Sequence, residues 1–355
     1  MDAVARTAVD VTAIRTARVA FVSCYGLSRG GPQFRCVDAA RHLTASGVPA
    51  ACVDGQGCAQ STLEQKFNGA RLQSIVVLKR PPAADALTTL RRHASTLLLD
   101  LMDQPPWLIR GVCHSPFDAY IADNARSWAT ISSKPRCPRL RGASVSLIEH
   151  PHTIARPVSN GRRQIRRALL VQEHREEEPQ FCEDLHGALP PGVHFDCFLL
   201  QSDARRARLF AAQLNISVSS AREAMSRPGG TGRLFADLFS LYDLLVVWRP
   251  TNHTVQRLTN ALATGVPTIA RDCAAFRAAF GVLGGDIEDD VLLARNLSEL
   301  GAMTLALRKS AALRTRVSRA GVRSAARFSP EAIAREYARA TGTADLVRQR
   351  LRRIG

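Results

Sequence analysis

The sequence predicts an α/β protein made of two Rossmann-like domains that face each other across a cleft, and three observations support this prediction. Short apolar runs alternate with amphipathic stretches along most of the chain, as in doubly wound parallel sheets. The alternation occurs twice, on either side of residues 150–164, which show no periodicity. The chain has 355 residues, which exceeds one ordinary core and suits two domains.

The clearest unit of this pattern is residues 241–270. The apolar run 244–247 predicts a buried parallel strand, and after a polar turn the apolar spacing predicts a helix over 254–264. Gly265 ends the helix, and 266–270 predict the next strand. The loop and the helix N-terminus then lie at the carboxyl end of a strand, where open α/β sheets bind ligands.

The first half of the chain begins as nucleotide-binding α/β domains do, with a strand, a glycine-bearing loop, a helix and a strand. Residues 1–16 are expected to form a loosely held extension, and 17–155 the first domain. The loop does not match GxGxxG, so the dinucleotide fingerprint is absent. Strands are predicted over 18–23, 48–53, 74–78, 96–101, 129–132 and 144–148, and helices over 32–46, 83–93 and, with interruptions, 107–128.

The second half follows a segment rich in Pro, Ser, Asn and Gly, which predicts an interdomain linker over 156–165. The second domain is expected over 166–328, and 329–355 are expected to form C-terminal helices and a basic amphipathic tail. Its further strands are predicted over 168–172, 193–199 and 216–218, and its helices over 204–214, 233–240, 273–280 and 297–325, with one more ending at 189.

The net charge is +17, and nearly all of the positive charge comes from arginine. A basic protein is attracted to nucleic acid, to anionic membrane surfaces and to phosphorylated substrates. Aromatic residues make up only 6% and do not alternate with the basic runs, so stacking platforms for single strands are missing. We therefore expect no specific nucleic-acid partner.

Targeting and cysteine patterns indicate a cytoplasmic protein. No run of about 18 uncharged apolar residues occurs, and the N-terminus has no apolar core of a secretory signal. Nine cysteines are scattered without a CxxC pair, so no zinc site is expected, and their odd number in a long chain without a signal predicts reduced thiols. The basic surface is compatible with peripheral attachment at the inner membrane.

Three segments resemble the retaining GT-B glycosyltransferases of the family-four-like group, glycosyl transferases group 1. The first is Arg29–Gln33 with the helix to Leu43 and the following Ser46-Gly47-Val48. The second is 242–270, where Ala261–Pro267 stands in the place of an A-M-A-x-G-x-P segment, and the third is 313–337. The resemblance implies a GT-B fold, a nucleotide-sugar co-substrate, no other cofactor and no metal.

The chain departs from this family at two positions. The family carries two glutamates eight positions apart, and here Asn252 and Asn260 stand there. Asparagine can bond a hydroxyl but cannot supply a carboxylate. By resemblance Asn252 would face the sugar and Asn260 the donor ribose, while Arg257 resembles a basic residue that some members carry in this helix.

Helix N-termini and arginine stabilise a leaving diphosphate well, and this chemistry selects the candidate site. For each arginine the alternative is a solvated surface charge. His114 is a candidate catalytic residue together with Asn252, while His150 and His152 border the predicted linker. The candidate donor-binding residues are Gly30, Gly31, Arg175, Arg249, His253, Thr254, Val255, Arg257 and Asn260.

The resemblance implies an enzyme of polysaccharide biosynthesis that transfers a sugar, with retention, from a nucleotide-sugar donor to a glycan or lipid-linked acceptor. The first domain would bind the acceptor and the second the donor. An alternative is a catalytically silent GT-B protein that binds nucleotide or glycan or supports a partner enzyme. A nucleic-acid-modifying glycosyltransferase is favoured only by the charge.

Overall fold

The computed structural model describes most of the chain in two compact units. Unit 1 combines Met1–His150 with Pro330–Gly355, and unit 2 is Pro151–Ser329. The described residues are 11–24, 27, 33–55, 59–79, 81–102, 117–123, 144–159, 161, 163–173, 179–200, 203–226, 230–248, 254–273, 276–277, 279 and 291–354.

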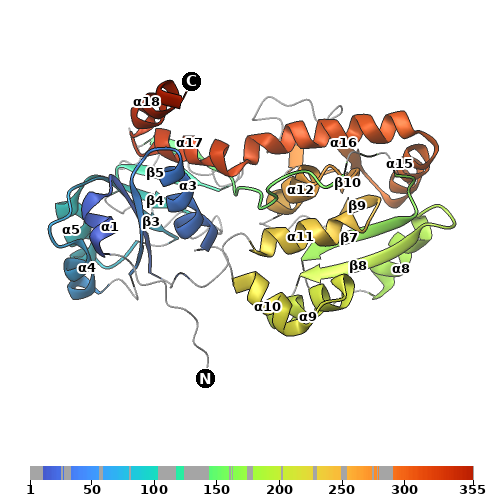
Figure 1. The fold of residues 1–355 in the computed structure, drawn as a ribbon, viewed down its shortest axis with the longest axis horizontal. Helices are drawn as coiled ribbons and strands as arrows, with labels where there is room; N and C mark the ends of the chain where they lie inside the picture. The colour runs from blue at the N-terminus through green and yellow to red at the C-terminus, as the bar shows by residue number, and fades with distance from the viewer. Residues whose placement is uncertain are drawn as a thin grey trace, which may run out of the picture. The chain divides into compact units, whose positions relative to one another are not determined.

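Unit 1 contains a parallel sheet of six strands in the order β2-β1-β3-β4-β5-β6 (Figure 1). Its strands are β1 Val19–Ser23, β2 Ala50–Asp54, β3 Leu72–Leu78, β4 Ala94–Asp100, β5 Ala119–Ala122 and β6 Ser144–Leu147. All five residues of β1 are buried, and its alternate side chains belong to different cores. Such a two-sided apolar strand is what a parallel sheet covered by helices on both faces requires.

Helices cover both faces of this sheet. They are α1 Val11–Thr16, the π-helix η1 Gln33–Asp38, α3 Ala39–Ala45, α4 Gln60–Phe67, α5 Ala84–His93, α17 Pro330–Ala340 and α18 Ala344–Ile354. One core includes Ile14, Leu63 and Leu90 from α1, α4 and α5. The other includes Leu43 of α3 and Tyr337 of α17, which packs beside α3 (Figure 1). The last two helices of the chain are therefore part of the core of unit 1.

Unit 2 contains a parallel sheet of five strands in the order β11-β10-β9-β7-β8. The strands are β7 Arg167–Glu173, β8 His194–Leu200, β9 Leu244–Val247, β10 Thr268–Arg271 and β11 Leu292–Ala294. The helices are α8 Pro179–Ala188, α9 Asp203–Leu214, α10 Val218–Ser226, α11 Gly230–Ser240, α12 Thr254–Ala263, α15 Leu297–Lys309, α16 Ala311–Ala325 and the 3₁₀ turn η3 Ala326–Phe328.

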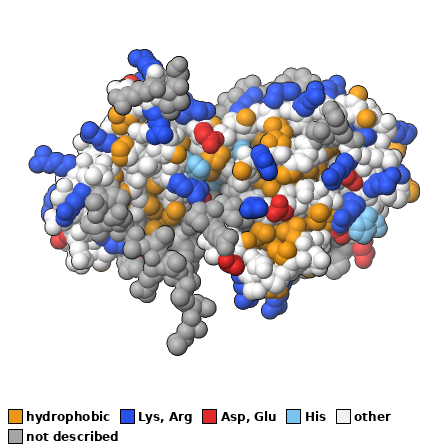
Figure 2. Space-filling model, viewed as in Figure 1, with side chains coloured by type: hydrophobic (Ala, Val, Ile, Leu, Met, Phe, Trp, Pro, Cys, Tyr) orange, Lys and Arg blue, Asp and Glu red, His pale blue; other side chains and the backbone are white. Residues whose placement is uncertain are grey.

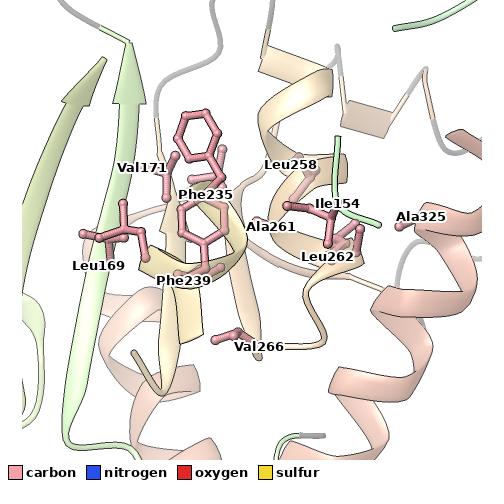
Figure 3. Close-up of a cluster of buried hydrophobic side chains, with 14 of the residues drawn as sticks. Ile154, Leu169, Val171, Phe235, Phe239, Leu258, Ala261, Leu262, Val266 and Ala325 are labelled. Atoms are coloured by element: carbon pink, nitrogen blue, oxygen red, sulfur yellow. The ribbon is translucent and has the colours of Figure 1, made fainter. Parts of the chain in front are cut away.

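The core on one face of the unit 2 sheet brings α11 and α12 together. Figure 3 shows Phe235 and Phe239 of α11 beside Leu169 and Val171 of β7, with Leu258 on α12. The opposite face is covered by α8, α15 and α16 through a separate cluster of buried residues. Layers of helix, sheet and helix therefore form each unit, as the alternating pattern predicts.

Several sequence-based expectations for individual elements are wrong. Residues 11–16 form a helix with Ile14 fully buried, and 119–122, expected within a helical stretch, form β5. Ser217 accepts a hydrogen bond from the Ser220 amide and starts α10, so 216–218 is no strand. The expected helix 297–325 breaks at Ser310, whose extended backbone and hydroxyl cap α16. The expected strand 129–132 lies outside the described residues.

The cysteine expectation is wrong at one position. Cys24 is disulfide-bonded, whereas Cys36, Cys52, Cys197 and Cys273 are free. None of the helices among the described residues has the length and hydropathy to cross a membrane.

Candidate functional sites

The candidate donor site of unit 2 is centred on α12, which starts at Thr254 after the carboxyl end of β9. Its first amides, including those of Thr254 and Val255, have no partner within the helix. They give the helix start the partial positive charge that attracts anions. The other predicted residues Gly30, Gly31, His114, Arg175, Arg249, Asn252 and His253 lie outside the described residues.

The helix α12 is buried on nearly all sides. Leu258, Ala261 and Leu262 enter the apolar cluster of unit 2 (Figure 3). After the helix, Gly265 adopts φ +72°, and a Cβ there would lie 2.2 Å from the Ser159 carbonyl oxygen. Only glycine suits both the left-handed conformation and this close approach, which holds the helix end against residue 159.

Arg257 is 6% exposed, so the alternative of a solvated surface charge is wrong for this arginine. It lies one turn into α12, near the positive end of the helix dipole. The cation and the helix start together favour a negatively charged group at this end of α12.

Asn260 is also buried, and its amide oxygen is engaged within unit 2. The Thr153 amide donates to Asn260 Oδ1 at 2.7 Å, and the Thr153 hydroxyl lies 3.2 Å from the same oxygen. One turn earlier, Gln256 Nε2 donates to the Pro151 carbonyl oxygen at 3.3 Å. Gln256 and Asn260 therefore tie α12 to residues 151–153.

Residues 152 and 153 make further close contacts within unit 2. The His152 amide donates to the Phe328 carbonyl oxygen at 2.8 Å. A Cβ at Gly232 would lie 2.1 Å from the Thr153 carbonyl oxygen, so only glycine lets α11 approach so closely. Gln256 is not among the residues predicted from the sequence, although its position between Asn252 and Asn260 on a largely apolar helix is a signal for it.

The histidines that border the predicted linker are both buried but belong to different units. His150 ends the first segment of unit 1, and His152 lies in unit 2. His150 Nε2 lies 3.9 Å from Asp123 Oδ2, a contact within unit 1. Across the described part of the chain, no group of three or more His, Cys, Asp and Glu residues is placed to hold a metal.

A buried ionic network lies at the carboxyl edge of the unit 1 sheet, and sequence reasoning missed it. Arg35 Nε and Nη2 donate to the two carboxylate oxygens of Asp100, each at 2.9 Å, and both side chains are fully buried. Arg35 Nη1 donates to the carbonyl oxygens of Ile148 and Glu149 at 2.6 and 3.1 Å. The Tyr337 hydroxyl donates to Asp100 Oδ2 at 2.9 Å.

This network joins four parts of unit 1: the π-helix η1, the end of β4, the segment after β6, and α17. The wider turn of the π-helix is the local irregularity from which Arg35 extends inward. The opposite charge of Asp100 raises the pKa of Arg35, although burial alone would lower it. Asp100 is therefore the partner of a buried arginine.

Glu149 is a second buried carboxyl group at this edge. Burial, with a smaller effect of the neighbouring Asp123 charge, raises the pKa of Glu149 to about 8. The Arg35 guanidinium opposes this shift but does not cancel it. The Glu149 side chain is therefore mostly a neutral acid at pH 7.

Comparisons with known proteins give a fold but no sequence family. No protein-family model matches the sequence, and no curated protein matches it. A solved glycosyltransferase from Rickettsia africae ESF-5 is similar with a TM-score of 0.56 and 9% identity, covering 93% of this chain and 99% of that chain. Sucrose-phosphate synthase from Thermosynechococcus elongatus is similar with a TM-score of 0.52 and 14% identity, covering 94% of this chain and 99% of that chain.

A third similar structure belongs to a longer chain. This protein spans 60% of a chain of the GtfA/B complex, at 10% identity and a TM-score of 0.49. At identities this low, the likeness to the two structures of matching length shows the fold alone. The α/β fold of two Rossmann-like units, and the resemblance to the GT-B architecture, are thereby confirmed.

Proposed function

We propose that this protein is a glycosyltransferase that takes a sugar from a nucleotide-sugar donor bound by unit 2. The observation that carries the proposal is the buried cation Arg257 near the start of α12, at the carboxyl edge of a parallel sheet. That combination suits a diphosphate. Two solved proteins with this fold are named a glycosyltransferase and sucrose-phosphate synthase, which supports sugar transfer as the reaction.

In the proposed reaction the bond between the anomeric carbon and the diphosphate oxygen breaks, and its electron pair leaves with the diphosphate. The amides of Thr254 and Val255 and the Arg257 guanidinium stabilise the charge that develops on that group. The acceptor hydroxyl oxygen bonds to the anomeric carbon with retention, and its proton passes to the departing diphosphate. The acceptor, a glycan or lipid-linked sugar, is bound by unit 1.

Replacement of Arg257 by alanine is expected to weaken nucleotide-sugar binding at least about tenfold, because a charge-assisted hydrogen bond contributes roughly 1.5–3 kcal/mol. Titration calorimetry with UDP-, GDP- and ADP-sugars measures the effect. Arg208→Ala removes an exposed arginine of α9 and serves as the matched control. Unchanged diphosphate binding in Arg257→Ala would contradict the role of Arg257.

A second candidate is a silent GT-B protein that binds nucleotide or supports a partner enzyme. It is favoured by Asn252 and Asn260, which supply no carboxylate, and by the engagement of Asn260 Oδ1 with Thr153. Incubation of the protein with a panel of nucleotide sugars distinguishes the two candidate functions. Release of free nucleoside diphosphate or a glycosylated product supports the enzyme, whereas binding without turnover supports the silent protein.

Attachment to an anionic membrane surface is proposed for α18. Val347 is buried and Leu346 packs against the core of unit 1, so the helix presents a basic side outward. Arg348, Arg350 and Arg352 are exposed. On the face drawn in Figure 2, other Lys and Arg side chains are scattered rather than gathered in one patch.

The double variant Arg350→Glu and Arg352→Glu is expected to weaken binding to phosphatidylglycerol-containing vesicles by at least about tenfold, given roughly 1 kcal/mol for each basic residue at such a surface. Flotation with phosphatidylcholine vesicles, with and without phosphatidylglycerol, measures the effect. The double variant Arg15→Glu and Arg71→Glu changes the charge equally at other exposed positions of unit 1. Equal loss in both double variants would show that net charge, not α18, governs the attachment.

A further inference from the structure

Three side chains gather where adjacent strands of unit 1 end. Asp123 directly follows β5, and Glu149 and His150 come two and three residues after the end of β6. The register aligns these ends, because Ala122 pairs with Leu147 and the Ile148 amide donates to the Ala122 carbonyl oxygen at 2.9 Å. This carboxyl edge is where open parallel sheets bind ligands.

Glu149 carries the strongest indication of a ligand. The residue is 4% exposed, and its Oε1 atom has no hydrogen-bond partner among the described residues. More than nine in ten buried polar groups are satisfied, so such an atom is suited to take a hydrogen bond from a ligand. The backbone beneath it is fixed, since Arg35 binds the carbonyl oxygens of Ile148 and Glu149.

We propose that Glu149, Asp123 and His150 form a binding position for one hydroxyl group of an acceptor sugar. This inference rests on the proposed glycosyl transfer and assigns residues of unit 1 to its acceptor. A hydroxyl group both accepts and donates, so it can accept from the acid form of Glu149 and donate to the Asp123 carboxylate.

The charges around Glu149 favour a neutral hydroxyl over an anion. Asp123 adds negative charge, and the guanidinium of Arg35 is committed to Asp100 and to two carbonyl oxygens. Among the described residues, His150 lies on the same segment and contacts Asp123, and the Tyr337 hydroxyl on α17 donates to Asp100. Because the pKa of Glu149 lies at about 8, its carboxyl group donates at neutral pH.

Binding of methyl glucoside, methyl galactoside and methyl mannoside to the full chain, measured by saturation-transfer NMR, tests the proposal. The wild type is expected to bind at least one of them. Glu149→Gln keeps a hydrogen-bond donor and should bind within about threefold, whereas Glu149→Leu and Asp123→Ala remove a donor and an acceptor and should each lose at least about tenfold. Glu64→Gln, an exposed change on α4, is the matched control.

The pH dependence of glycoside binding tests the proposal independently. Above about pH 8 the wild type should lose glycoside affinity as Glu149 ionises, and Glu149→Gln should not. Circular dichroism and nucleotide-sugar titration on the same samples show whether each variant is folded. If Glu149→Leu is unfolded, Asp123→Ala and the pH profile remain as the test. The proposal is overturned if Glu149→Leu or Asp123→Ala binds the glycosides as well as the wild type, or if the wild type binds none of them. Failure of nucleotide-sugar binding is a separate result that counts against the proposed function.

Discussion

Replacing Asp100 by asparagine is expected to destabilise unit 1 by about 3–5 kcal/mol, because the change leaves the Arg35 cation buried without its carboxylate. Both side chains are fully buried, and Asp100 holds Arg35 at two nitrogens and Tyr337 at its hydroxyl. The effect is large since the chain cannot expose Arg35 without releasing the segment after β6, to which the same guanidinium is bonded.

Urea unfolding followed by hydrogen exchange in peptides of β3 and β4 measures this loss within unit 1. Asp118→Asn is the matched control, because Asp118 pairs with Arg91 at the surface, with side chains 43% and 39% exposed. That change should cost no more than about 1 kcal/mol. The double variant Arg35→Met and Asp100→Leu should recover most of the stability lost in Asp100→Asn. Equal costs for Asp100→Asn and Asp118→Asn would show that burial does not determine the strength of the Arg35 pair.

The sequence predicts the apolar framework of this fold much better than its buried charges. The strand 244–247 and the helix that follows could be predicted because each buries a continuous apolar run or stripe. The helix α4 was missed because only Leu63 and Phe67 of its eight residues are buried. Residues 119–122 are too few to distinguish a buried strand from a helix by periodicity.

In the candidate sites too, features set by local pattern could be predicted and contacts between distant residues could not. The location of α12 at the carboxyl edge of its sheet follows from local pattern alone. The bonds from Thr153 to Asn260 join residues 107 positions apart, and Arg35 meets Asp100 across 65. A polar residue in the sequence carries no signal for such a distant partner, so Arg35 reads as a surface charge until the tertiary fold is known.

Glu149→Gln is expected to make the protein more stable than the wild type by up to about 5 kcal/mol above pH 8, since each unit of pKa shift corresponds to about 1.4 kcal/mol. The pKa of Glu149 rises from 4.5 in the unfolded chain to about 8 in the folded one. The folded chain therefore binds this proton more tightly. Stability that is fully present below pH 4.5 is lost as the pH rises to about 8.

Thermal unfolding of the wild type and of Glu149→Gln between pH 4 and 9 measures the difference. The two melting temperatures should nearly coincide at pH 4, where both side chains are neutral, and separate progressively up to about pH 8. Other groups titrate in both proteins, so the difference isolates Glu149, and the same substitution at the exposed Glu64 serves as the control. A separation that does not change with pH would mean that Glu149 is ionised throughout the range. The neutral carboxyl group would then be unable to donate to a sugar hydroxyl, so this measurement on the protein alone also bears on the acceptor position.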